Sequence, residues 1–211
     1  MAYPQEKTSQ AYRKYYIDRD YEQIDLFRSI RNSYHVSKAI YPGSYIHISP
    51  AFIFPYVVFI DSDKTAIKFF QTQSYLGIVN SRKEYSEPSN IAFFGIDYRK
   101  FLEEYRSFFD LLISQYAGFI SDVCKPYLRI GGYLLVNNSH GDAGFASIDK
   151  DYKLISAIHR TNGKYRLSDS SMEDYFKPKK EIIVTKDLLK QRKKGIGYTK
   201  TTSLYLFQKI R

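Results

Sequence analysis

The chain has 211 residues, 44% of them hydrophobic, which is enough to build the core of one ordinary to large domain. Its net charge is +10, and its single cysteine, Cys124, excludes an internal disulfide and is expected to be a buried, reduced thiol. Since no apolar run reaches about 18 residues and the mixed-charge N-terminus lacks an apolar signal core, we expect a cytoplasmic protein without a membrane span.

The first part of the chain is expected to be one amphipathic helix. Apolar side chains recur near helical spacing from Ile17 to Ile30, and no strong breaker lies between Ser9 and His35, which predicts a helix over 8–35. We assign residues 1–35 to an N-terminal helical segment that caps the sheet. Residues 36–211 follow without a clear boundary and are predicted to form one domain, in which 160–200 is a basic insertion.

The rest of the chain alternates between short apolar runs and helical patterns. The expected strands are 36–41, 56–60, 91–96, 109–113, 133–136, 153–159 and 203–209. The expected helices are a short one from Ser49-Pro50 to Pro55, then 64–73, 98–108, 119–128 and the basic helix 186–194. This alternation predicts an α/β, Rossmann-like fold: a mostly parallel seven-stranded sheet with an antiparallel last strand and helices on both faces.

One spacing indicates a nucleotide site. Asp61 closes the second predicted strand and lies 18 residues after Gly43, close to the spacing at which a carboxylate binds a ribose in α/β nucleotide sites. A carboxylate can accept hydrogen bonds from both ribose hydroxyls. The alternative is that Asp61 caps the next helix, although Asp63 is equally placed to do so.

Other polar residues follow the predicted strands, where open parallel sheets bind their ligands. The candidates in chain order are Tyr41, Gly43, Ser44, Asp61, Asp97, Ser114, Gln115, His140 and Asp142. His47, near the first loop, is interpreted as a structural histidine or as a base. The polar stretch 137–142 is either functional or a surface loop capped by Asn and Asp. No spacing typical of a metal site, a P-loop or a GxSxG nucleophile occurs.

The succession of elements resembles the class I S-adenosylmethionine-dependent methyltransferase fold over about residues 36–211. The resemblance rests on the architecture, on the "FDLLIS" fourth strand, on the Gly-Gly before the fifth strand in "LRIGGYLLVNN", and on the acids Asp61 and Asp97 closing strands two and three. It departs from the family in the first loop, which has one glycine in Tyr41-Pro42-Gly43-Ser44-Tyr45. The NPPY-type motif after the fourth strand is also absent.

The resemblance implies an S-adenosylmethionine cofactor and methyl transfer to a nucleic acid or a small molecule. It implies that Asp97 accepts from the adenine amine, with a helix cap as the alternative, and that His140 or Asp142 removes a proton from the acceptor. The single-glycine loop supports a different interpretation, a non-catalytic Rossmann-like binding or assembly module with a degenerate cofactor site. A nicotinamide-dependent oxidoreductase is disfavoured because GxGxxG is absent and the final strand pair is predicted to be antiparallel.

The charge is concentrated near the C-terminus. Residues 160–200 hold twelve Lys and Arg against five Asp and Glu, so +7 of the net +10 lies there. The predicted nucleic-acid contacts are Lys186, Lys190, Arg192, Lys193 and Lys194. The alternative is a solvated helix face whose cations suit the helix C-terminus.

Overall fold

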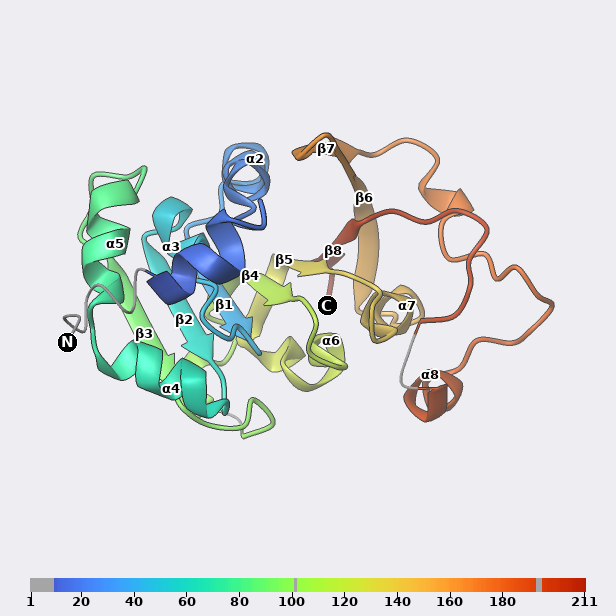
Figure 1. Cartoon of the computed structure of the whole chain (residues 1–211). Coiled ribbons are helices and arrows are strands. Elements are labelled where there is room, and N and C mark those ends of the chain that lie inside the picture. Colours follow the sequence, from blue (N-terminus) through green and yellow to red (C-terminus); the bar gives the residue numbers. More distant parts are fainter. Residues whose placement is uncertain (1–9, 101, 193–194) are drawn as a thin grey trace. The chain divides into compact units, whose positions relative to one another are not determined.

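The computed structural model describes residues 10–100, 102–192 and 195–211. The chain divides into two compact units, Met1–Lys100 and Phe101–Arg211, which are described in turn (Figure 1).

The first unit contains three parallel strands in the order β3-β2-β1. They are β1 (Lys38–Pro42), β2 (Tyr56–Ile60) and β3 (Asn90–Phe94). β1 and β2 are buried except at their first residues, in keeping with β-branched and aromatic runs that are covered on both faces. Because the pairing is parallel and in register, from Lys38 opposite Tyr56 to Pro42 opposite Ile60, the carboxyl ends of β1 and β2 lie together.

Helices surround these strands. They are η1 (Arg13–Ile17, one π-helical turn), α2 (Ile24–Tyr34), α3 (Pro50–Ile53), α4 (Lys64–Gln71) and α5 (Tyr75–Arg82). The short helix α3 is wholly buried and contacts α2, α5 and β2. The prediction that it begins at Pro50 and stops before Pro55 is confirmed. The Ser49 hydroxyl does not cap it, however, and is hydrogen-bonded to the hydroxyl of Tyr12 at 2.8 Å.

The prediction of one continuous helix over 8–35 is wrong for its described part. Residues 10–12 are helical and run into η1, but the chain then turns before α2 begins. Asp20 and Gln23 adopt left-handed backbone conformations, with φ of 50° and 60°, which end a right-handed helix. The turn brings the carboxylate of Glu22 to the guanidinium of Arg82 (Oε1 to Nη1, 2.6 Å), and this pairing competes with helical continuation. Ile17, expected to face the core, is 42% exposed.

The second unit contains five strands in the order β4-β5-β8-β6-β7. They are β4 (Phe109–Ser114), β5 (Leu128–Val136), β6 (Tyr152–Thr161), β7 (Lys164–Ser168) and β8 (Leu204–Lys209). β4 and β5 are parallel, and β8 lies between β5 and β6, antiparallel to both. The predicted antiparallel last strand is therefore confirmed, but the described chain has eight strands rather than seven.

The additional strand is β7, which pairs with β6 as an antiparallel hairpin (Figure 1). Its turn is Asn162-Gly163, with φ of 51° and 76°, the left-handed pair that two-residue hairpin loops require. The Asn-Gly dipeptide was the sequence signal for this hairpin. The helices of the unit are η2 (Glu103–Tyr105), α6 (Ile120–Val123), η3 (Lys125–Tyr127), α7 (Asp142–Ser147), η4 (Met172–Asp174) and α8 (Lys186–Arg192).

Two predicted helices are largely replaced by other structure. Over 98–108 the described residues form only the turn η2, because Leu102 is extended and Ser107 has a φ of 52°. The expected helix 119–128 ends at Val123 and is followed by η3, since Pro126 has no N–H to continue it. The third strand also ends earlier than predicted, at Phe94 rather than Ile96.

Gly131 and Gly132 do not separate a helix from the fifth strand, as predicted, but lie inside β5. Pairing with β4 shifts register there: Phe109 is opposite Leu128, whereas Leu111 is opposite Tyr133. Gly131 has a φ of 79°, which only glycine adopts readily. The glycine pair therefore accommodates an irregularity in the strand.

None of the helices in the described ranges is both long enough and apolar enough to cross a lipid bilayer.

Gly132 is predicted to be intolerant of a side chain. An added Cβ would lie 2.8 Å from Leu128 Cδ1, 3.0 Å from Arg129 O and 3.1 Å from Asp110 O, so Gly132→Ala should lower the free energy of unfolding. The expected cost is about 1–3 kcal/mol, measured by urea denaturation. Gly118→Ala is the matched control, because a Cβ there meets no atom within 4 Å. Equal effects of the two substitutions would contradict this account.

Candidate functional site

The loop that follows β1 is closed by its own hydrogen bonds. Gly43 takes a φ of 68°, and its N–H donates to the carbonyl of Ile60 at 2.7 Å, which holds the loop to the end of β2. Ser44 is buried, and its hydroxyl donates to the Tyr45 carbonyl at 3.3 Å. The loop is thus compact and fastened to the neighbouring strand.

Asp61 joins the same loop to the end of β2. Its Oδ2 accepts the N–H of Tyr45 at 2.7 Å, and its Oδ1 accepts the N–H of Asp63 at 2.8 Å. The cap of α4 is Asp63, whose carboxylate accepts from Thr65 and Ala66, so the alternative role suggested for Asp61 belongs to Asp63. Asp61 is half-buried, and each of its carboxylate oxygens has a second lone pair for a ligand hydroxyl. Gly43 and Asp61 therefore meet at one place, as the spacing predicted.

Aromatic side chains from the N-terminal segment pack on this loop. The rings of Tyr15 and Tyr45 meet edge to face at 5.4 Å, and the ring of Tyr16 stacks on His47 at 4.5 Å. Tyr45 has a φ of 50°, an uncommon conformation for a bulky residue, and it aims its N–H at Asp61. Sequence analysis did not single out Tyr45. The signal was its place directly after Gly43-Ser44, where a conventional loop would carry another small residue.

His47 is a structural histidine. Its Nε2 lies 3.2 Å from the carbonyl of Glu22, which only accepts, so Nε2 carries the proton and Nδ1 accepts from the Tyr41 hydroxyl at 3.3 Å. Burial lowers the pKa of His47 from 6.5 to about 4. The neutral ring is thus fully engaged, and Tyr41, predicted to contact the cofactor, is buried with its hydroxyl turned to this histidine.

Asp97 lies beyond the end of β3 and is half-buried. Its carboxylate accepts from the backbone N–H and the guanidinium of Arg99, with Nε at 2.9 Å from Oδ1. The hydrogen bond from the Arg99 side chain lowers the pKa of Asp97 to about 2. Neither a contact with Asp61 nor a helix cap was found for Asp97 in the described chain, and its role toward an adenine stays a prediction.

In the second unit, Ser114 and Asp142 come together although 28 residues separate them. The Ser114 hydroxyl donates to Asp142 Oδ2 at 2.5 Å, and the N–H and hydroxyl of Ser121 also donate to this carboxylate. The carboxylate is buried, and burial raises its pKa. Asp142 thus links the end of β4, the start of α6 and the start of α7. Ser121, inside a predicted helix, carried no sequence signal for this contact.

The loop between β5 and α7 is organised by its two asparagines. Asn137 Oδ1 accepts from the N–H and hydroxyl of Ser139, and Asn138 Oδ1 accepts the N–H of Gly144 at 3.0 Å. These contacts agree with the interpretation of a loop capped by Asn side chains. His140 lies half-exposed in it, and no described residue hydrogen-bonds to its ring. Gln115 is buried after β4.

Two lysines of the basic helix α8 form ion pairs with acidic residues of the same unit. Lys186 Nζ lies 3.0 Å from Asp149 Oδ2, and Lys190 Nζ lies 3.3 Å from Asp122 Oδ2. Both ammonium groups also lie over the ring of Phe145, at 4.8 and 5.2 Å from its centroid. Arg192 is exposed, whereas Lys193 and Lys194 lie outside the described residues. Nucleic-acid contact through this helix stays a prediction.

No protein-family model matches the chain, and no curated protein does either. Solved structures do match. A Corynebacterium glutamicum protein has a TM-score of 0.50 and 10% identity, over 100% of this chain and 91% of that one. A methyltransferase from Geobacter sulfurreducens has a TM-score of 0.49 and 14% identity, over 74% of this chain and 85% of that one.

A third similar structure is the O-methyltransferase TomG from Streptomyces achromogenes, solved in complex with S-adenosylmethionine. Its TM-score is 0.49 and its identity is 14%, over 79% of this chain and 87% of that one. At these identities the likeness concerns the fold alone. The fold is a Rossmann-like α/β fold, with the strand orders β3-β2-β1 and β4-β5-β8-β6 within the two units.

His47 is predicted to make the protein less stable in mild acid. The unfolded chain binds a proton at this residue below pH 6.5, whereas the folded chain does so only near pH 4. Its contribution to the free energy of unfolding is therefore present above pH 6.5 and decreases by about 3 kcal/mol as the pH falls toward the folded pKa. Urea denaturation from pH 7 to pH 4.5 should show this loss in the wild type and a smaller one in His47→Gln. Identical pH profiles would contradict the assignment.

Asp142 is predicted to act mainly through its hydrogen bonds. Asp142→Ala leaves the Ser114 and Ser121 donors without a buried acceptor and should cost about 3 kcal/mol or more. Asp142→Asn keeps an acceptor oxygen, removes the buried charge and can donate to the Ser114 hydroxyl, so its expected cost at pH 7 is under about 1.5 kcal/mol. Chemical denaturation of the two variants measures the difference, and an Asn variant as unstable as the Ala variant would overturn it.

Proposed function

We propose that the protein is an S-adenosylmethionine-dependent methyltransferase. The observation that carries the proposal is the convergence of the Gly43 loop and Asp61, with Tyr45 N–H 2.7 Å from Asp61 Oδ2 at the end of β2. The fold supports it, since open parallel sheets bind nucleotides at the carboxyl ends of their strands. The acceptor proposed from the charge distribution is a nucleic acid, with a small molecule as the alternative.

The residues present fit the nucleoside part of the cofactor. Asp61 is half-buried and retains acceptor capacity on both oxygens, which suits a ribose diol. Gly43 has no Cβ, so it adopts its positive φ without steric cost and leaves the backbone at the turn open to close approach. In this proposal Gly43 and Ser44 shape the loop, and Asp61 holds the ribose. When bound, the cofactor supplies a methyl group on a sulfonium, which a nucleophilic acceptor can take.

Proton removal from the acceptor is assigned in this proposal to His140 rather than to Asp142. The His140 ring is half-exposed, whereas the Asp142 carboxylate is enclosed by Ser114 and Ser121. A general base must reach the proton that it removes. Asp142 would then act as a positioning residue for the loop. Contacts of Tyr41, Asp97, Ser114 and Gln115 with the cofactor stay predictions.

A second candidate function is a non-catalytic binding module with a degenerate cofactor site. It is favoured by the hydrogen bonding of the first loop, in which the N–H groups of Gly43, Tyr45 and His47 all donate within the protein. A loop of this kind offers fewer backbone donors to a ligand than a glycine-rich loop does. Direct measurement of cofactor binding distinguishes the two candidates.

Calorimetric titration with S-adenosylmethionine tests the proposal. We expect binding by the wild type and a loss of roughly 5- to 150-fold in affinity for Asp61→Asn, about 1–3 kcal/mol, because a charged acceptor for the ribose becomes neutral. Asp63→Ser is the matched control: it removes the same charge two residues away, retains a capping oxygen and should bind normally.

The outcomes separate the candidates. If S-adenosylmethionine, its demethylated product and NAD all give no heat of binding, the non-catalytic module is supported. If NAD alone binds, the chain is an oxidoreductase. Unchanged affinity in Asp61→Asn would show that the Asp61 carboxylate does not bind the ribose.

A further inference from the structure

A segment of the basic insertion, residues 177–184, is held at both ends. At its start, the Lys179 N–H donates to the Gly197 carbonyl at 2.9 Å, and the Thr199 N–H donates to the Lys177 carbonyl at 2.8 Å. At its end, Ile182 and Val184 pack against a buried cluster. The members of that cluster are Phe145, Leu189, Ile196 and Tyr198. The segment between these anchors is therefore a fixed feature of the surface.

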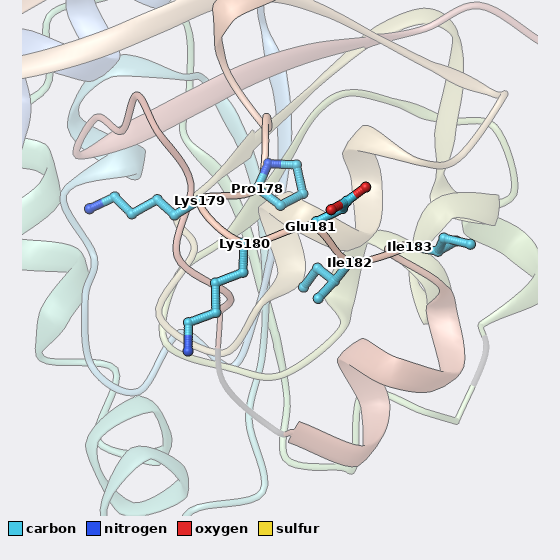
Figure 2. A pocket seen from close by; sticks show the side chains of 6 residues that line it. All are labelled: Pro178, Lys179, Lys180, Glu181, Ile182 and Ile183. Carbon is cyan, nitrogen blue, oxygen red and sulfur yellow. The ribbon is translucent and has the colours of Figure 1, made fainter.

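The anchoring forces one apolar side chain outward. Burial alternates along these residues: Ile182 and Val184 are half-buried against the cluster, whereas Ile183 between them is exposed. It is 87% exposed, the largest exposure among the large hydrophobic residues of the described chain. An open pocket of about 630 Å³ lies along the segment, lined by residues from Pro178 to Ile183 (Figure 2).

Two lysines on this pocket are available to a ligand. Lys179 and Lys180 are exposed, and neither forms an ion pair or hydrogen bond through its side chain within the described chain. Figure 2 shows their ammonium groups directed away from the carboxylate of Glu181. Other cations of the insertion are engaged: Lys186 and Lys190 with Asp149 and Asp122, and Lys177 with Asp174.

We infer that the pocket from Pro178 to Ile183 is a binding site for single-stranded nucleic acid. Lys179 and Lys180 would contact phosphates of the strand, and the exposed side chain of Ile183 would offer an apolar contact to an unstacked base. Residues 160–200 carry a net charge of +7, and the part that Asp149 and Asp122 do not offset favours a long polyanion over a short acidic peptide, because it attracts ligand charge well beyond the pocket. This inference concerns binding and stands apart from methyl transfer.

Fluorescence anisotropy with a labelled single-stranded oligonucleotide of about 12 nucleotides tests the inference. Affinity should fall steeply with salt. Lys179→Ala with Lys180→Ala should flatten the slope of log K against log salt by about 1.4, or roughly 25-fold in affinity at about 0.1 M salt. Ile183→Ser should weaken binding by roughly 3-fold without changing the slope.

Lys186→Ala with Lys190→Ala is the competing variant: it removes the same charge from the same insertion, but at α8, the helix for which nucleic-acid contact was predicted from the sequence. It should lower the melting temperature, because Asp122 and Asp149 lose partners, and leave the salt slope nearly unchanged. The inference is overturned if Lys179→Ala with Lys180→Ala binds like the wild type, or if the competing variant flattens the slope more. It is also overturned if phosphatidylserine vesicles or polyglutamate bind and the oligonucleotide does not. No cofactor is present in this experiment. A negative result on oligonucleotide binding therefore does not affect the calorimetric test of S-adenosylmethionine binding.

Discussion

The carboxylate of Asp61 holds the first unit's candidate site together. It accepts one backbone N–H from the loop after β1 and one from the turn before α4, at 2.7 and 2.8 Å. Charge-assisted bonds to backbone donors are stronger than neutral ones, so this side chain reinforces the bond from the Gly43 N–H to the Ile60 carbonyl in fastening the loop to the end of β2. The same carboxylate is the proposed ribose acceptor. Loop geometry and ligand binding would therefore depend on one group.

In the other unit a buried acid, Asp142, also holds separate elements together by accepting hydrogen bonds, but its pKa is shifted by burial. Asp142 is buried, and its neighbours are hydroxyls and an N–H rather than cations, so desolvation prevails and its pKa rises. The pKa of Asp97 is lowered instead, because the side chain of Arg99 donates hydrogen bonds to its carboxylate. The two acids looked alike in the sequence, as polar residues near strand ends. Asp142 is buried among hydrogen-bond donors from two other elements, whereas half-buried Asp97 pairs only with the neighbouring Arg99 in the contacts given above.

Much of the fold could be predicted because its signals are local. YVVFI and FDLLI form buried strands as expected, the prolines on either side of α3 mark its limits, and Asp63 caps α4. The failures came where tertiary contacts override local pattern. Glu22 pairs with Arg82, 60 residues away, and interrupts a periodic helical segment. Gly132 lies inside β5, where an added Cβ would meet Leu128 and Arg129 of that strand and Asp110 of β4, which no local pattern reveals.

For the candidate sites, too, features set by local sequence could be predicted, whereas features set by tertiary contacts could not. The distance from Gly43 to Asp61 follows from a β-strand–helix–strand unit of ordinary length, so their convergence was predictable. Which lysines of the basic insertion form ion pairs within the protein could not be predicted from the sequence. Lys186 and Lys190 face acids supplied by Asp149 and Asp122, whereas Lys179 and Lys180 lie on a segment whose inward positions are taken by Ile182 and Val184. A count of charges treats these four lysines as equal. Only the packing of the insertion separates the pair that stabilises the fold from the pair that is free to attract a ligand.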